Sequence, residues 1–166
     1  MSFRVKDRVV YPHHGAAVIE ATETRSMPPD GEDKEFFVLR MTHGDLLLKV
    51  PVDKAEEIGM RYPISVEDVE DVFEVLAKKD VREPTNWSRR FKNHQEKMKS
   101  GDIYECAEVV RNLSLRERSS KLSSAEKAML GKARHILVSE LAVSWDCSME
   151  DAGDRIDAVL DGLAIA

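Results

Sequence analysis

The sequence has little of what marks most specialised protein classes. Only 2 of its 166 residues are cysteine, and aromatic residues make up 6%. Cys106 and Cys147 fit no disulfide or zinc-ligand spacing, which favours a reducing compartment. No apolar run approaches the roughly 18 residues of a membrane span, and the residues after Met1 lack the apolar core of a signal peptide. We therefore expect a cytoplasmic protein without a membrane segment.

Sequence signatures of enzymes are also absent. The chain contains no phosphate-binding Walker loop, no dinucleotide-binding glycine pattern, no zinc-protease helix motif and no nucleophile elbow. His13 and His14 are adjacent and precede Gly15, so we expect them to form a turn rather than a metal site. Cys106 lies on an apolar helical stripe and is expected to be a buried small hydrophobe. The sequence therefore predicts no catalysis, no metal, no cofactor and no small-molecule substrate.

The net charge of −6 is unevenly distributed along the chain. Residues 1–77 carry 9 basic and 16 acidic side chains, residues 78–134 carry 15 and 8, and residues 135–166 carry 1 and 7. A basic block between acidic segments is typical of a protein that touches a polyanion with one face. It is equally compatible with a solvated helical surface rich in Lys and Arg. The acidic ends argue against a general nucleic-acid coat protein.

The first part of the chain has the residue pattern of short β-strands. Apolar runs punctuated by turn residues predict strands over 8–11, 17–25, 36–41 and 46–50. A loop is predicted over 27–33, because two prolines, a glycine and acidic charge oppose a strand there. Four or five short strands in about fifty residues indicate a small, strongly bent barrel or half-barrel.

Beyond about residue 60 the apolar spacing becomes helical. Five helices are predicted, and their expected N-caps are Ser65, Thr85, Asp102, Ser123 and Ser148. Spacing of i, i+3 and i+4 predicts inward side chains at Val66, Val69, Val72, Phe73, Leu76, Ile103, Cys106, Ala107, Val110, Leu113, Met129, Leu130, Ala133, Ile136, Leu137, Leu141, Ile156, Val159, Leu160 and Leu163. The prediction is an α+β chain, with a small β-barrel domain over 1–62 and an all-α helical domain over 63–166.

The most informative segment begins the second predicted helix. If Thr85 caps that helix, Trp87 lies in its first turn, where free N–H groups attract a phosphate. Arg89, Arg90 and Lys92 add positive charge within two turns. An aromatic ring beside several cations is the composition of a nucleic-acid contact. Alternatively, Trp87 belongs to a core stripe with residues 91 and 98.

Three parts of the chain resemble one family. Val9–Ala17, Glu83–Arg90 and two stretches within Ser124–Leu137 are similar to the CarD/CdnL family of bacterial RNA-polymerase-binding transcription regulators. The resemblance covers nearly the whole chain, and Pro84–Arg90 is its most specific string. It implies a Tudor-like RNA-polymerase-interacting domain, shared with transcription-repair coupling factor, followed by a helical DNA-binding domain.

The resemblance also implies a partner for the N-terminal domain, the β subunit of RNA polymerase. By match to the basic positions of the family that contact polymerase, Arg25 and Lys49 would lie on that surface. Many members carry arginine in place of Lys49. Lysine lacks the planar bidentate geometry of arginine, so this contact would differ in kind.

For the helical domain, the resemblance implies contact with promoter DNA at the upstream edge of the transcription bubble. Trp87 would wedge into the minor groove, and Arg89, Lys92 and Lys127 would contact phosphates. Arg90 joins these DNA-binding residues by its charge and position. The implied outcome is a stabilised open promoter complex, without sequence-specific operator recognition.

The cationic cluster is small, so DNA binding alone would be weak and salt-sensitive, of the roughly 10⁻⁴–10⁻⁶ M kind. Anchoring on polymerase would raise the effective DNA concentration. We expect a monomer that associates with the nucleoid through polymerase. Two alternatives are a protein–protein adaptor with Trp87 as an interface hot spot, and a small hydrolase or metal enzyme.

Overall fold

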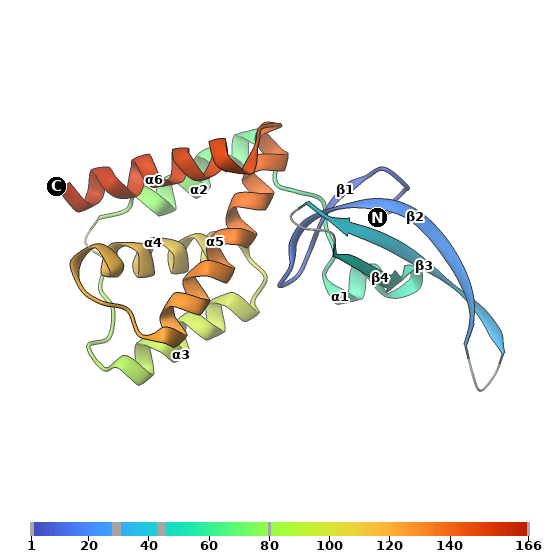
Figure 1. The fold of residues 1–166 in the computed structure, drawn as a ribbon, viewed down its shortest axis with the longest axis horizontal. Coiled ribbons are helices and arrows are strands. Elements are labelled where there is room, and N and C mark those ends of the chain that lie inside the picture. Colours follow the sequence, from blue (N-terminus) through green and yellow to red (C-terminus); the bar gives the residue numbers. More distant parts are fainter. Residues whose placement is uncertain (1, 28–30, 43–45, 80, 166) are drawn as a thin grey trace. The chain divides into compact units, whose positions relative to one another are not determined.

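The structure is a computed structural model of residues 1–166 (Figure 1). It describes all residues except 1, 28–30, 43–45, 80 and 166, and the side chains of 27, 164 and 165 are also outside the description. The chain forms two compact units, residues 1–63 and 64–166, which we call the β module and the helical domain.

The β module is a four-stranded antiparallel sheet in the order β1-β2-β3-β4. Its strands are β1 Arg8–Tyr11, β2 Gly15–Met27, β3 Glu32–Met41 and β4 Leu47–Pro51. The four predicted strands are confirmed, but β2 and β3 extend further than predicted. The two strands stay paired as far as Met27 and Glu32, and Ser26 Oγ donates to Asp33 Oδ1 at 2.9 Å near that end. The prediction of a loop over 27–33 was therefore too long; residues 28–30 lie outside the described residues.

The sheet curls into the expected half-barrel. The register of β2 against β3 shifts between Ile19 and Ala21, and such an irregularity bends a strand and increases its twist. Alternate side chains of β3 then point into one core, because side chains along a strand alternate in direction. The buried apolar members of that core are Val9, Ala17, Ile19, Phe37, Leu39, Met41, Val50, Ala55 and Met60.

A short helical segment that the sequence did not reveal follows β4. It comprises a 3₁₀ turn, η1 Val52–Lys54, and the helix α1 Ala55–Ile58. Gly59 ends α1 at φ 104°, a left-handed conformation that favours glycine. The chain then returns to β1, where Val10 N–H donates to the Arg61 carbonyl at 2.7 Å. This pairing ties the end of the β module to its first strand.

The helical domain contains the five predicted helices. They are α2 Val66–Ala77, α3 Trp87–Lys99, α4 Ile103–Ser119, α5 Ser124–Trp145 and α6 Met149–Ile165. Helix α4 contacts each of the other four and is the centre of the domain (Figure 1). The predicted N-caps Ser65, Asp102, Ser123 and Ser148 are confirmed, since each side chain accepts a hydrogen bond from a backbone N–H of the first turn.

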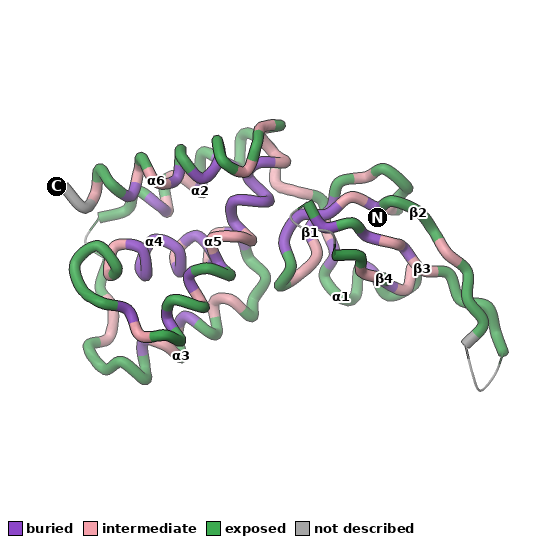
Figure 2. The backbone as a smooth tube through the Cα atoms, viewed as in Figure 1, coloured by how far each residue is buried: buried purple, intermediate pink, exposed green. Residues whose placement is uncertain are grey.

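The core of the helical domain follows the predicted apolar stripes, which appear as buried segments on the facing sides of the helices (Figure 2). All five inward positions of α4, including Cys106, are buried. Val66 and Leu163 differ: Val66 is 54% exposed at the first residue of α2, and Leu163 is half-buried and not a member of this core. Two polar bonds fix the entry to the domain: Glu140 accepts from Ile64 N–H at 2.9 Å, and Ser144 Oγ donates to the Ile64 carbonyl at 2.7 Å.

Candidate nucleic-acid interface

The segment around Trp87 begins α3 one residue later than the sequence predicted. Asn86, not Thr85, is the N-cap, and its side chain accepts from Arg89 N–H at 3.1 Å. Asparagine caps helices as well as or better than threonine, and the Thr85 carbonyl is instead a hydrogen-bond acceptor for Arg90 at 3.4 Å. The prediction that Trp87 lies in the first turn is confirmed, since it is the first residue of α3.

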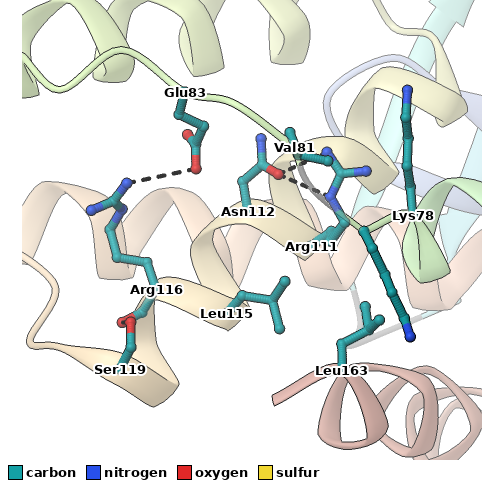
Figure 3. Close-up of a pocket in the computed structure, with 10 residues that line it drawn as sticks. Lys78, Val81, Glu83, Arg111, Asn112, Leu115, Arg116, Ser119 and Leu163 are labelled. Carbon is teal, nitrogen blue, oxygen red and sulfur yellow. Dashed lines mark hydrogen bonds and ion pairs between the residues drawn. The ribbon is translucent and has the colours of Figure 1, made fainter. Parts of the chain in front are cut away.

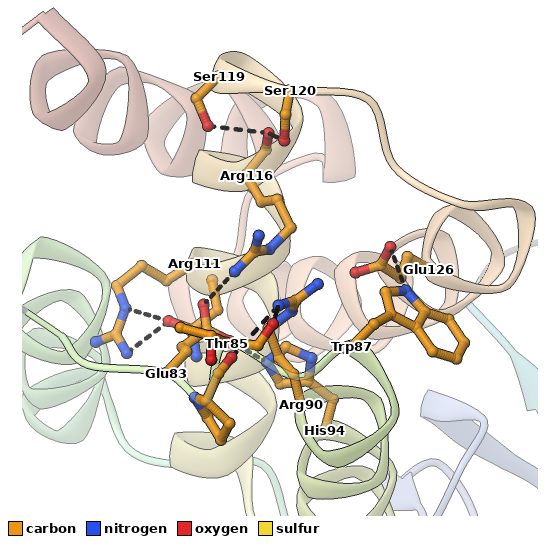
Figure 4. A network of polar contacts seen from close by, with 12 residues as sticks. Glu83, Thr85, Trp87, Arg90, His94, Arg111, Arg116, Ser119, Ser120 and Glu126 are labelled. Carbon is orange, nitrogen blue, oxygen red and sulfur yellow. Dashed lines mark hydrogen bonds and ion pairs between the residues drawn. The ribbon is translucent and has the colours of Figure 1, made fainter.

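Trp87 is exposed, yet its ring has defined neighbours. The residue is 42% exposed, which contradicts the core interpretation. Its ring stacks on the half-buried Phe91, with centroids 5.0 Å apart and planes at 10°. Its indole N–H donates to Glu126 Oε1 at 3.0 Å, as the close-up shows (Figure 4). A large apolar surface is thus presented to solvent in a fixed orientation.

Glu126 couples this tryptophan to the start of α5. It is the N3 residue of the capping box predicted at Ser123, and its Oε1 also accepts from Ser123 N–H at 3.2 Å. Burial acts to raise the pKa of the Glu126 carboxyl, but hydrogen bonds from Trp87 and Ser123, with the charge of Arg90, outweigh it and lower the pKa below its ordinary value. Glu126 is therefore held as an ionised acceptor.

Three of the predicted DNA contacts lie near Trp87 on exposed helical positions. Arg89 and Lys92 are in the first two turns of α3, and Lys127 is in the first turn of α5. All three are exposed and have no ion pair with another described residue. A surface hollow lined by Trp87, Lys127 and residues 120–124 joins the two helix starts. The fold therefore brings together residues 40 positions apart in the sequence.

Arg90 is much less exposed than the other three basic residues that were predicted to contact DNA. It is 8% exposed, and its Nη1 donates to the carbonyls of Pro84 and Thr85 at 3.3 and 3.4 Å (Figure 4). The side chain turns inward because residues three to four apart share a helix face, and His94, four residues later, is also buried. Arg90 therefore supports the segment that precedes α3, and it reaches the surface only as part of the lining of the hollow beside Trp87. Its contact with DNA stays a prediction.

The basic block of residues 78–134 is less positive at its surface than the sequence suggests. Arg90 and Arg111 are buried, and four more basic side chains form ion pairs. Two of those pairs join the block to acidic residues of α6, through Arg118 with Asp161 at 2.6 Å and Arg134 with Asp157 at 2.7 Å. The remaining nine basic side chains are exposed: Lys78, Lys79, Arg82, Arg89, Lys92, Lys99, Lys121, Lys127 and Lys132.

In the β module, one carboxylate connects the two residues expected to bind polymerase. Glu23 accepts from Arg25 Nε at 3.3 Å and forms an ion pair with Lys49 Nζ at 3.0 Å. All three side chains are exposed to water. Chiefly the Lys49 ammonium, with help from Arg25, lowers the pKa of the Glu23 carboxyl. The structure thus places Arg25 and Lys49 on one polar surface, called here the Glu23 cluster.

The described residues contain no group of three or more His, Cys, Asp or Glu side chains arranged to hold a metal ion. His13 and His14 form the turn between β1 and β2, as predicted. Within the same residues, no helix is long and apolar enough to cross a membrane.

Both units of the chain match known families. The family model described as the CarD-like/TRCF RID domain matches residues 3–63, and that of the CarD C-terminal domain matches residues 71–157. The chain is also 31% identical over 141 residues to the Bacillus subtilis (strain 168) protein named "Putative transcription factor YdeB", covering 85% of this chain and 91% of that relative. The resemblance found in the sequence is confirmed, and the chain belongs to the CarD/CdnL family of bacterial transcription regulators, with a role in transcription.

Proposed function

We propose that this protein anchors on RNA polymerase and stabilises the open promoter complex. In this proposal the β module binds the polymerase β subunit through the Glu23 cluster, and the helical domain holds promoter DNA at the upstream edge of the bubble. Membership of residues 3–63 in the CarD-like/TRCF RID family, which is known for polymerase interaction, supports the first part. The protein would act as a monomer, in the cytoplasm and at the nucleoid.

One observation supports the DNA contact best: Trp87 is exposed but oriented. An indole that is stacked on Phe91 and hydrogen-bonded to Glu126 has lost much of its rotational freedom before it meets a partner. Pre-ordering of this kind lowers the entropic cost of binding. The exposed cations Arg89, Lys92 and Lys127 would hold the phosphates on either side of the ring.

The charge around Trp87 favours DNA over a protein partner. The centre of a protein–protein interface is depleted in charged residues, whereas Trp87 is accompanied by exposed basic side chains from two helices. Phosphate contacts position a duplex without reading its sequence. The indole would fill the gap at an unstacked base step in the minor groove. Because that gap exists only after the duplex distorts, the contact would slow bubble collapse more than it aids first binding.

The proposal is tested by the lifetime of the open complex on a weak promoter, measured with and without the protein. We expect a longer lifetime with the protein, and a salt-dependent footprint at the upstream bubble edge only when polymerase is present. A protein that binds polymerase but changes neither the lifetime nor the footprint would act as an adaptor, and the DNA part of the proposal would be wrong.

A further inference from the structure

The helical domain contains a second hollow that the proposed function does not use. It is a cavity of about 480 Å³ between the end of α2, the segment after it, α4 and the end of α6 (Figure 3). This volume lies within the roughly 300–1,000 Å³ of small-molecule sites. Arg116 also lines the hollow beside Trp87, but the rest of the cavity is made by other residues.

Positive charge dominates the lining of this cavity. Lys78, Lys79, Arg111 and Arg116 contribute four cationic side chains, and Glu83 contributes the single carboxylate among the described lining residues. That carboxylate is already engaged, since it lies 3.1 Å from His94 Nε2 and 3.6 Å from Arg116 Nη2. The exposed Lys78 and Lys79 have no ion pair with any described residue. The described lining of the cavity therefore has a surplus of cations.

Arg111 is the member of this set that most needs an anion. It is 2% exposed, and among the described residues its guanidinium donates only to neutral oxygens: the Val75 carbonyl at 2.8 Å and the Asn112 Oδ1 at 2.8 and 2.9 Å. Within the described part of the chain, no carboxylate oxygen lies within ion-pair distance of it. Burial lowers the pKa of the Arg111 guanidinium, although the more distant Glu108 and Glu83 oppose this. A buried charge without a counter-ion is costly.

The remaining wall of the cavity is partly apolar. Val81, Leu115 and Leu163 line it, and Val81 is 38% exposed although it is a large apolar side chain. Lysine ammonium groups bind phosphates as point charges, and arginine binds them through its planar fork. An apolar wall beside such groups suits a ring rather than a bare ion. We propose that this cavity binds a nucleoside phosphate, with its phosphates against the cationic side chains of the lining and its base against the apolar wall.

The proposal is tested by isothermal titration calorimetry on the full chain, with ADP and GDP as probes and with pyrophosphate and adenosine as partial ligands. We expect at least one nucleotide to bind more tightly than either partial ligand. The double variant Lys78→Ala/Lys79→Ala should weaken nucleotide binding by about tenfold or more. About tenfold is the loss expected if only one of the two lysines contacts the phosphates. Both side chains are exposed, so the variant should fold.

Two control variants make the result specific to this cavity. Lys99→Ala/Lys132→Ala removes the same charge from exposed positions outside the cavity and should change nucleotide binding by less than about twofold. Arg89→Ala/Lys92→Ala should also leave it intact, because those residues belong to the proposed DNA surface. Absence of nucleotide binding at millimolar concentration, equal losses in the cavity and control variants, or loss confined to Arg89→Ala/Lys92→Ala would overturn the proposal. Pyrophosphate binding as tight as that of the nucleotides would refute the role of the apolar wall.

Discussion

Replacement of Glu126 by alanine tests whether the orientation of Trp87 matters. The substitution removes the acceptor of the indole N–H and one half of the capping box at the start of α5. A lost helix cap costs about 0.5–2 kcal/mol. The indole N–H is partly exposed and can bond to water instead. We therefore expect a total loss of about 1–2 kcal/mol and a melting temperature lower by about 5–10 °C for a domain of this size.

The functional effect of Glu126→Ala follows from the freedom that the indole regains. Immobilising a side chain at an interface costs about 0.5–1.5 kcal/mol, so the open-complex lifetime should fall by about 2- to 10-fold. Glu126→Gln keeps an acceptor oxygen at the same position and is the matched control. Its effect on the lifetime should be clearly smaller than that of alanine.

A double-mutant cycle separates orientation of the ring from stability of α5. Phenylalanine at position 87 keeps a ring but has no N–H for Glu126 to accept. In the Trp87→Phe background, Glu126→Ala should therefore leave the open-complex lifetime unchanged, while it still lowers the melting temperature through the capping box. An equal fall of the lifetime in both backgrounds would refute the reasoning, because Glu126 would then act independently of the tryptophan.

Three further predictions concern surface charge and pH. Neutralising Arg89 and Lys92 together should lower the magnitude of the salt slope of DNA engagement by about 2, and to a similar extent on promoters of different sequence; a loss on one promoter alone would indicate base readout. Arg25→Glu should weaken capture of the polymerase β subunit, whereas Arg40→Glu, which breaks the comparable exposed pair with Glu20, should not; equal losses would contradict a role for the Glu23 cluster. The wild type should melt at a higher temperature than Glu126→Gln near neutral pH, and this difference should shrink as the pH falls through the lowered pKa of Glu126. A difference that persists in strong acid would show that this carboxylate contributes nothing through its charge.

The sequence predicted the elements of this fold well where local chemistry decides them. The caps at Ser65, Asp102 and Ser123 depend on side chains within one turn of the helix start, and the buried stripe of α4 depends on its own spacing. The exact cap of α3 was wrong because two adjacent residues, Thr85 and Asn86, both have capping side chains. In the structure the Asn86 side chain accepts from Arg89 N–H, and Asn86 is therefore the cap.

The parts of the site that the sequence could not predict depend on contacts between helices. The hydrogen bond from Trp87 to Glu126 joins residues 39 positions apart. Each residue already has a role at the start of its own helix, so the sequence gives no sign that the two are in contact. Arg90 carries the same charge as Arg89, but its position on α3 turns it toward the interior. Charge counted along the chain therefore overstated the basic surface, since ion pairs to α6 and burial both remove cations from it.

The central claim is that Trp87 is a wedge at the edge of the bubble, and the half-life of the open complex with Trp87→Ala tests it most directly. Stacking of a ring on a base is worth about 1–3 kcal/mol, so the half-life should fall by about 5- to 150-fold, toward that of polymerase alone. Because Trp87 is 42% exposed, the variant should lose much less than the roughly 3–5 kcal/mol of a core tryptophan and should still bind polymerase. A folded, polymerase-bound variant that preserves the full half-life would contradict the account.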